Sequence, residues 1–130
     1  MDYQNTLKYL YESAPMFQQI GSKAYKPGLE TTHRLDEHFG HPHQQFKTIH
    51  IAGTNGKGSV IAYLYTTLTR AGYKVGRYIS PTLYSYRERL EIAGEKISQE
   101  AFAKYVTEIS RSIDQMTAVG MNHPTPFEIE

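Results

Sequence analysis

The sequence contains no cysteine, so disulfide bonds and thiolate metal sites are excluded. It has no apolar stretch long enough to cross a membrane, and charged residues interrupt the opening segment where a signal peptide would need an apolar core. It also lacks a charge excess, because 14 Lys and Arg stand against 13 Asp and Glu, and the basic residues are scattered. That distribution is not typical of a nucleic-acid-binding surface. We therefore expect a soluble, cytoplasmic chain of one domain at most, with neither a nucleic-acid nor a membrane partner.

The N-terminal part of the chain predicts two helices separated by a loop. The opening helix is predicted from apolar residues that share one helical face: Tyr3, Leu7, Leu10 and Tyr11. Pro15 helps to stop this helix, and a loop rich in Gly, Lys and Pro follows at 21–30. A second, shorter helix is predicted around Leu29 and Phe39 and ends at Gly40.

The middle of the chain predicts a strand, a helix and a second strand in succession. The segment 47–52 is a short run of β-formers, and a glycine-rich loop follows it at 53–58. Apolar spacing over 59–72 indicates a helix, which Gly72 ends, and a second strand is predicted at 74–80. This succession is a βαβ unit, whose strands should be parallel and joined by a right-handed crossover.

The segment 86–98 predicts one arm of a β-hairpin and its turn. Arg87, Arg89 and Glu91 alternate with largely apolar residues, so one face is charged and the other apolar. The hairpin should turn at Ala93–Gly94. We expect a half-exposed strand with its charged face in solvent.

Two further helices are predicted after the hairpin. The first spans roughly 99–119, with an apolar stripe formed by Phe102, Val106, Ile109, Ile113 and Met116. The last six residues look like the start of another helix, with Thr125 as the N-cap and Glu128 at the capping-box position.

The glycine-rich loop has the composition of an anion-binding site. Its candidate residues are Gly53, Thr54, Asn55, Gly56, Lys57, Gly58 and Ser59. A strand that runs through such a loop into a helix directs several backbone N–H groups at one spot, at the positive end of the helix dipole. The three glycines favour positive φ angles and a close approach of the anion, and Lys57 adds a full charge for the outer phosphates. The expected ligand is a nucleoside triphosphate, with nearby hydroxyls for phosphate or magnesium.

The loop departs from the general phosphate-loop pattern and matches a narrower one. The general pattern GxxxxGK[ST] has glycine where this chain has Ile51, and a hydroxyl residue where it has Gly58. The string GTNGKGS at 53–59 instead resembles the loop of the Mur-ligase superfamily, most closely its folate branch of folylpolyglutamate and dihydrofolate synthases. A cell-wall Mur ligase is the nearest rival, which Gly58 disfavours because those enzymes usually carry threonine there.

A second stretch resembles the same branch independently. The segment 78–98 is similar to the branch's TSPHL and NERI segment and its following I-S, and the matching residues are Ser80, Pro81, Leu83, Glu88, Arg89, Gly94, Ile97 and Ser98. The strings KPGLE and TPFEIE are also similar to the family, so the resemblance runs from about residue 20 to the end. Ile79, Thr82 and Arg87 depart from the family pattern, but they lie outside the phosphate loop.

The resemblance implies an ATP-dependent ligase that joins L-glutamate to a folate or dihydropteroate carboxylate through an acyl phosphate. Lys57, the loop amides and Mg²⁺ would neutralise the transferred phosphoryl group. By the family pattern Ser80 corresponds to a serine that helps to hold magnesium, whereas a capping or turn role is its alternative. Glu128 matches a family glutamate whose role the residues do not define, and a capping box with Thr125 is its alternative.

The resemblance also implies a fold and an incomplete domain. We expect an α/β fold: the N-terminal portion of a Mur ligase-like phosphate-loop domain, with the parallel βαβ unit, a hairpin insertion and flanking helices. Residues 1–130 would be an N-terminal fragment of the ATP-binding domain, without the remainder of that domain or the C-terminal domain. Such a fragment is expected to be inactive alone and to self-associate through an unpaired sheet edge.

Some alternatives remain open from the sequence. A nucleotide-binding module without ligase chemistry is the second candidate function, although such a module does not need the segment from Ser80 to Ser98. Arg87, Glu88 and Arg89 are interpreted as a solvated strand edge rather than a catalytic trio. The scattered histidines have no partner cysteines, so surface and core roles are favoured over zinc. Whether the substrate is dihydropteroate, a reduced folate or both is left open.

Overall fold

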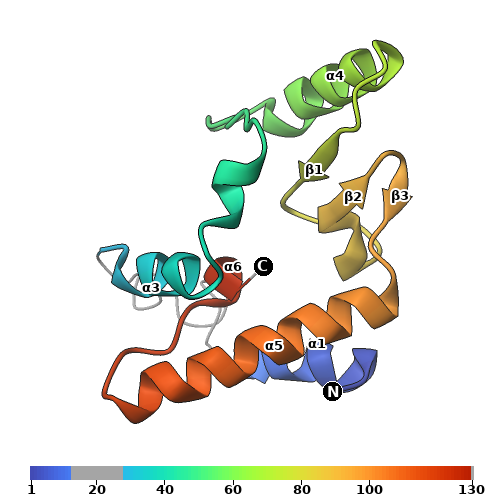
Figure 1. Ribbon diagram of the computed structural model, residues 1–130. Helices are drawn as coiled ribbons and strands as arrows, with labels where there is room; N and C mark the ends of the chain where they lie inside the picture. Colours follow the sequence, from blue (N-terminus) through green and yellow to red (C-terminus); the bar gives the residue numbers. More distant parts are fainter. Residues whose placement is uncertain (13–27, 130) are drawn as a thin grey trace. The chain divides into compact units, whose positions relative to one another are not determined.

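The computed structural model describes residues 1–12 and 28–129, which belong to two compact units (Figure 1). Unit 1 comprises Met1–Lys47 and Ala103–Glu130, and unit 2 comprises Thr48–Phe102. The predicted stop at Pro15 and nearly all of the predicted loop at 21–30 lie outside the described residues. None of the described helices is both long enough and apolar enough to pass through a bilayer.

Helix α1 (Tyr3–Glu12) opens unit 1 and confirms the predicted first helix. Its start is capped by Asp2, whose Oδ1 accepts a hydrogen bond of 2.8 Å from the Asn5 amide. The helix buries Thr6 and Leu10 completely, and the terminal ammonium of Met1 donates to Thr107 Oγ1 of helix α5 (Gln99–Ala118) at 3.0 Å. Figure 1 shows α1 beside α5, so residues distant in sequence form the core of this unit.

Helix α3 (Glu30–His38) confirms the predicted second helix and buries Leu35. Gly40 follows it with a φ of 70°, the left-handed conformation that commonly ends a helix. A short 3-10 turn, η2 (Pro42–Gln45), comes next. His41, just before this turn, and His43, within it, contact the two carboxylate oxygens of Asp36 through their Nδ1 atoms at 2.6 and 2.8 Å. These histidines therefore have the surface role that was favoured for them.

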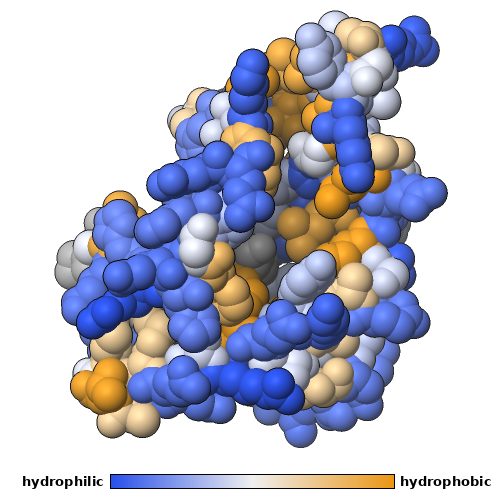
Figure 2. Space-filling model, viewed as in Figure 1, coloured by the Kyte–Doolittle hydropathy of each residue, from blue (hydrophilic) through white to orange (hydrophobic). Residues whose placement is uncertain are grey.

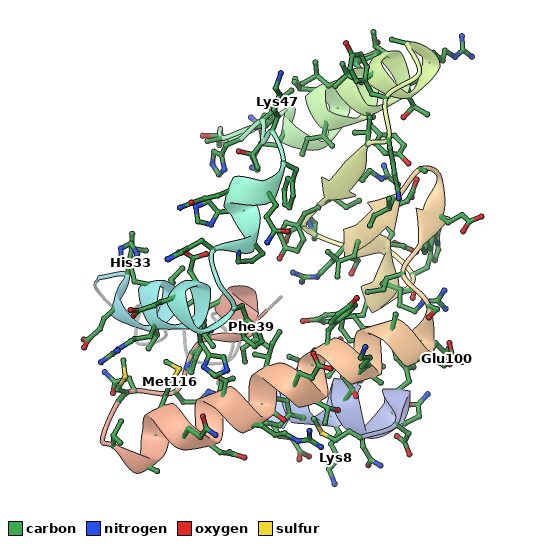
Figure 3. All side chains as sticks on the ribbon, viewed as in Figure 1. Lys8, His33, Phe39, Lys47, Glu100 and Met116 are labelled. Carbon is green, nitrogen blue, oxygen red and sulfur yellow. The ribbon has the colours of Figure 1, made fainter. Side chains whose placement is uncertain are left out.

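Helix α5 (Gln99–Ala118) supplies most of the apolar core of unit 1 and confirms the predicted long helix. The predicted stripe is buried at Val106, Ile113 and Met116 in unit 1 and at Phe102 in unit 2, and only Ile109 is half-buried. Met116 lies on the side of α5 that faces α3 (Figure 3). Exposed charged side chains such as Lys8 and Glu100 lie at the surface (Figure 3).

Helix α6 (Pro126–Ile129) confirms the last predicted helix and its capping box. The amide of Thr125 donates to Glu128 Oε2 at 2.8 Å, and the amide of Glu128 donates back to Thr125 Oγ1 at 3.3 Å. The reciprocal pair satisfies two amide donors at the start of the helix. The capping box with Thr125, which was the alternative role for Glu128 in the sequence analysis, is therefore formed.

Unit 2 is built on helix α4 and a small sheet. Helix α4 (Lys57–Arg70) confirms the predicted central helix. The strands β1 (Gly76–Tyr78), β2 (Leu90–Ile92) and β3 (Glu95–Lys96) form one sheet in the order β1-β2-β3. Both strand pairs are antiparallel, and the 3-10 turn η3 (Tyr86–Arg89) precedes β2.

The expected parallel βαβ unit is not formed by the described residues, and this expectation is corrected. Residues 47–52 have no strand assignment, and β1 pairs antiparallel with β2 instead. An extended segment becomes a strand only when a neighbouring strand accepts and donates its backbone hydrogen bonds. No described strand lies beside 47–52, so the β-forming composition of this segment is not sufficient.

The hairpin turn is confirmed at Ala93–Gly94. Glu91 pairs with Lys96 and Ile92 with Glu95, which leaves a two-residue connection. Both turn residues have positive φ, 52° at Ala93 and 87° at Gly94. This is the conformation of a type I′ turn, which matches the twist of antiparallel strands.

The orientation predicted for the hairpin strand, now β2, is wrong. Glu91, expected in solvent, is 9% exposed, whereas Ile92, expected on the inner face, is 57% exposed. The buried carboxylate is stabilised by an ion pair of 2.7 Å between its Oε2 and Arg77 Nη2 on β1. A cross-strand cation thus reverses the side of the strand that faces inward.

Apolar side chains remain exposed on unit 2. Figure 2 shows hydrophobic surface in the region of α4 and the sheet. Ile49 is 62% exposed, Val60 44% and Leu83 83%. No residue of α4 is buried. Unit 2 therefore leaves part of its apolar surface uncovered within the described chain.

Candidate functional site

The loop before α4 has the backbone geometry that an anion site needs. Gly53 has a φ of 154° and Gly56 a φ of 81°, and Gly56 is the N-cap of α4. Residues with a Cβ are strained in the left-handed conformation of Gly56, so glycine is favoured there. The positive φ angles at Gly53 and Gly56 bend the chain between residues 53 and 56 toward the start of the helix. Thr54, Asn55 and Ser59 are all exposed beside it.

The N-terminus of α4 has free hydrogen-bond donors. Its first intrahelical bond runs from the Val60 amide to the Gly56 carbonyl at 3.0 Å, and no side chain caps the helix. The amides of Lys57, Gly58 and Ser59 therefore have no intrahelical acceptor. They lie at the positive end of the dipole of a helix of 14 residues. An anion placed there would be bound by amide hydrogens and by the dipole together.

Lys57 is folded over the loop. Its Nζ donates to the Gly53 carbonyl at 2.6 Å and lies 3.4 Å from the Thr54 carbonyl. The side chain is half-buried, whereas most of its neighbours in the loop are exposed. The ammonium thus lies beside the loop backbone at which a phosphate would bind. A phosphate oxygen could replace the two carbonyl oxygens as its hydrogen-bond acceptor.

Gly58 differs from the expectation for the three glycines. It lies within α4, it is not among the residues with positive φ, and a Cβ built on it would meet nothing within 4 Å. Because the helix tolerates a side chain at this position, backbone strain does not explain the glycine. The expected positive φ is found at Gly53 and Gly56 only.

Ser80 follows β1 in the same unit as the phosphate loop. It lies two residues beyond the end of that strand, is exposed, and precedes a cis peptide bond to Pro81. A serine hydroxyl is a hard oxygen ligand of the kind that Mg²⁺ accepts. The serine and the loop residues Gly53–Ser59 are thus all in unit 2.

The segment after Ser80 is held by Glu88. Its Oε2 accepts hydrogen bonds from the amides of Leu83 at 3.0 Å and Tyr84 at 3.3 Å, and Lys96 Nζ lies 3.6 Å from its Oε1. The backbone bond from Leu83 is the main cause that lowers the pKa of Glu88, against a smaller opposing effect of burial. The carboxylate is therefore ionised and fixes the shape of the loop that follows Ser80.

The expected solvated strand edge at Arg87, Glu88 and Arg89 is corrected. These residues form the η3 turn, and all three are half-buried. Arg87 Nε donates to the Ile97 carbonyl at 2.6 Å, and the Arg89 guanidinium lies 4.8 Å from the centroid of the Tyr86 ring. Arg87 thus joins the turn to the end of the hairpin, and Arg89 packs within the turn itself.

Glu128 lies in unit 1 and accepts hydrogen bonds from three threonines. Its Oε1 accepts from Thr31 Oγ1 at 2.5 Å and Thr32 Oγ1 at 2.8 Å, and its Oε2 accepts from the amide and hydroxyl of Thr125. Burial raises the pKa of Glu128, but the hydrogen bonds, led by that of Thr31, outweigh it and lower the pKa. The carboxylate therefore links α6 to the start of α3.

Tyr65 is a residue whose contacts the sequence did not reveal. Of the tyrosines interpreted as packing and helix surface, Tyr63 is 77% and Tyr73 65% exposed. Tyr65 instead accepts a hydrogen bond of 2.5 Å from the Gly94 amide and bonds with Glu91. Its position eight residues after Lys57, on the same helix, is the one signal that connects it to the loop.

The described chain has a pocket that the phosphate loop does not line, and it has no cluster of metal-binding side chains. A pocket of about 350 Å³ in unit 1 is lined by residues of α3, including Arg34 and His38, and by Ser112 and Met116 of α5. Within residues 1–12 and 28–129, no group of three or more His, Asp and Glu side chains is placed to hold a metal ion.

Comparisons with known proteins identify relatives of the chain. No protein-family model matches it. It is 36% identical over 104 residues to the dihydrofolate synthase/folylpolyglutamate synthase of Bacillus subtilis, covering 80% of this chain and 24% of that protein. The crystal structure of the Thermotoga maritima folylpolyglutamate synthase matches 98% of this chain and 28% of its own, with a TM-score of 0.83 and 37% identity. A folylpolyglutamate synthase complex with AMPPCP and folate matches 99% of this chain and 30% of its own, with a TM-score of 0.77 and 31% identity.

These similarities confirm the resemblance that the sequence motifs indicated and the expected fold class. The chain spans roughly a quarter to a third of the length of the proteins that it matches. Sequence and structure agree on the same group of proteins, and the structural match covers nearly all of the chain. The chain is thus a relative, over part of their length, of the folylpolyglutamate and dihydrofolate synthases of the Mur ligase fold.

Proposed function

We propose that this chain supplies the ATP phosphate-binding part of a ligase that joins L-glutamate to a folate or dihydropteroate carboxylate. The observation that carries the proposal is the loop Gly53–Ser59 at the N-terminus of α4, with the Lys57 ammonium folded over it. Its free amides, exposed hydroxyls and half-buried cation suit a polyphosphate. The names of the related proteins supply the ligase reaction, and one of their structures contains AMPPCP and folate.

Within this ligase, each residue of the site has a proposed role. Lys57 would contact the outer phosphates and stabilise the charge that develops when the γ-phosphoryl group passes to the carboxylate. The amides after Gly56 would bind the phosphate oxygens, and Thr54, Asn55 and Ser59 would border them. The acyl phosphate formed in this way would then be attacked by the amino group of L-glutamate.

Mg²⁺ fits the residues present through a small set of oxygen ligands. Ser80 is exposed and offers a hydroxyl, and no described cluster of carboxylates competes as a cation site. Mg²⁺ usually keeps several waters and is bound by one or two protein groups together with substrate phosphates. Ser80 would therefore hold the ion jointly with the nucleotide, and the ion would neutralise phosphate charge.

The proposal also states which part of the enzyme binds which substrate. Residues 1–130 would act as an N-terminal fragment of a cytoplasmic enzyme, binding nucleotide while the remaining parts of the enzyme supply the other substrate contacts. The chain alone is then expected to bind AMPPCP and to release no ADP from ATP in the presence of L-glutamate and dihydropteroate or tetrahydrofolate.

Calorimetric titration of the whole chain with AMPPCP and MgCl₂ tests the nucleotide site. Lys57→Ala should weaken binding about 10- to 100-fold, because a charge-assisted contact to phosphate is lost. Lys74→Ala is the matched control, since Lys74 is an exposed lysine of the same unit outside the loop, and it should bind as the unaltered chain does. Equal affinity of the two variants would refute the assignment of the loop.

A further inference from the structure

Helix α4 packs only in part on its unit: Ile61, Leu64 and Leu68 are half-buried, and polar contacts to the sheet add to them. None of its 14 residues is buried, although the helix begins at the phosphate loop (Figure 1). A helix of this length is marginal in water without tertiary contacts. Its persistence, and the direction of its N-terminal amides, therefore depend on the few contacts that it makes with the sheet.

Those contacts converge on Tyr65. Its hydroxyl accepts a hydrogen bond of 2.5 Å from the Gly94 amide at the hairpin turn, and the same hydroxyl bonds with the carboxylate of Glu91 on β2. The guanidinium of Arg77, on β1, lies 5.1 Å from the centroid of the Tyr65 ring. One side chain of α4 thus contacts both β1 and the β2–β3 hairpin.

We propose that Tyr65, Arg77 and Glu91 form an anchor that fixes α4 on the hairpin and thereby positions the loop Gly53–Ser59 for the nucleotide. The second part of this proposal, the positioning of the loop for the nucleotide, rests on the proposed function. Tyr65, Arg77 and Glu91 are positioning residues in this scheme, because they act on the phosphates only through the helix.

Burial and charge explain why the three side chains act together. Glu91 is 9% exposed and its ion pair with Arg77 measures 2.7 Å, so removing either partner leaves a poorly solvated charge. Burial raises the pKa of Glu91, but the bonds from Arg77 and Tyr65 outweigh it and keep the carboxylate ionised. For Tyr65, burial and the bond to Glu91 raise the pKa, so its hydroxyl stays protonated and can donate.

The anchor reaches the loop through a rigid element. Tyr65 lies eight residues after Lys57, which corresponds to about 12 Å along an α-helix. A helix pinned at Tyr65 and at its loop cannot tilt or unwind freely, whereas one pinned at the loop alone can open as a unit. We therefore expect loss of the Tyr65 hydroxyl to increase opening throughout α4.

Amide hydrogen exchange on the whole chain without nucleotide tests the anchor directly. Tyr65→Phe keeps the ring that faces Arg77 and removes only the hydroxyl. It should speed exchange of the Gly94 amide and of the amides Val60–Leu64 about three- to tenfold, as expected when one hydrogen bond is lost. Tyr63→Phe removes a hydroxyl from a 77% exposed tyrosine of the same helix and should leave these rates unchanged.

Two comparisons decide between the anchor and an incidental contact. Glu91→Gln, which keeps the shape and removes the charge, should speed exchange of Val60–Leu64 as Tyr65→Phe does. If Val60–Leu64 exchange in Tyr65→Phe at the rate seen in Tyr63→Phe, the anchor is overturned. Exchange is measured without ligand, so this result stands whether or not the chain binds nucleotide.

A nucleotide titration then tests the link to the loop. Tyr65→Phe should weaken AMPPCP binding about three- to tenfold while Tyr63→Phe leaves it unchanged, since only the first variant loosens α4. Faster exchange with unchanged affinity would overturn the positioning role. If the unaltered chain binds no AMPPCP, the proposed function and the positioning role both fail, and the exchange data alone decide whether the anchor exists.

Discussion

The carboxylate of Glu128 shows how much one residue contributes at the smallest scale. It accepts four hydrogen bonds from three threonines, and no described cation forms an ion pair with it. Since its pKa is lowered in the folded chain, it contributes stability above its unfolded-state pKa. That contribution is lost as the pH falls through the folded-state pKa, because protonation removes the charge that the hydroxyls stabilise.

A threonine variant tests this linkage. Thr31→Val should lower the free energy of unfolding by about 1–2 kcal/mol at pH 7, as expected for a hydrogen bond to a charged group. The difference from the unaltered chain should shrink below about pH 4, where glutamate becomes protonated. Urea unfolding followed by circular dichroism at pH 7, 5 and 3 measures it.

Thr66→Val is the control for that experiment, because Thr66 is an exposed threonine on α4 with no bond to a carboxylate. It should change the stability by less than about 0.5 kcal/mol at every pH, as surface substitutions usually do. A loss in Thr31→Val that does not vary with pH would contradict the assigned bond to an ionised Glu128.

At the scale of single elements, the β2–β3 hairpin carries a strained turn. Ala93 has a φ of 52°, a left-handed conformation that alanine adopts at a cost and that asparagine tolerates better. Ala93→Asn should therefore raise the free energy of unfolding by about 0.5–1 kcal/mol. Gly94→Ala, at a φ of 87°, should lower it. Thermal unfolding of the two variants would contradict this account if both moved the midpoint in the same direction.

Helix α5 offers a second prediction at this scale. Ile113 is 0% exposed in the core of unit 1, whereas Val119, just beyond the helix, is 78% exposed. Ile113→Ala should destabilise the chain by about 2–5 kcal/mol, because it removes buried methyl groups and leaves a cavity. Val119→Ala should cost less than about 0.5 kcal/mol. Denaturant titration of both variants checks the contrast, and similar losses would refute the burial assigned to Ile113.

The helices were predictable from the sequence, whereas strand pairing was not. Apolar spacing located α1, α3, α4 and α5 because helical hydrogen bonds and faces are local in sequence. The strand expected at 47–52 failed because a strand depends on a neighbour that composition does not specify. Glu91 was placed on the wrong face because its partner Arg77 lies 14 residues away, and a charged residue was assumed to seek solvent.

The candidate site was predictable in part for a similar reason. The glycines and Lys57 mark the loop from local sequence, and the positive φ at Gly53 and Gly56 agrees with that prediction. Tyr65 was not predictable as a contact of the hairpin, since its bond to Gly94 joins residues 29 positions apart. Contacts of that range become visible only when the fold is known.

At the scale of the whole molecule, the exposed apolar surface of unit 2 predicts association. Ile49, Val60 and Leu83 are exposed to solvent, and surfaces of this kind favour contact with another protein surface. We expect the chain to self-associate at micromolar concentration, and sedimentation velocity over a concentration series measures this. Leu83→Glu should shift the distribution toward monomer. A monomer at all concentrations would rule out self-association.

The contacts of the Lys57 ammonium have a consequence for selectivity among anions. In the free loop the ammonium already has the Gly53 carbonyl at 2.6 Å and the Thr54 carbonyl at 3.4 Å as acceptors. An incoming anion must replace these carbonyls as acceptors, so an ion with several oxygens loses little in the exchange. Chloride offers no directional oxygen acceptors in return, and it should compete poorly with a polyphosphate even at a large excess. A loop closed by its own lysine thus discriminates by the number and spacing of oxygen atoms, in addition to total charge.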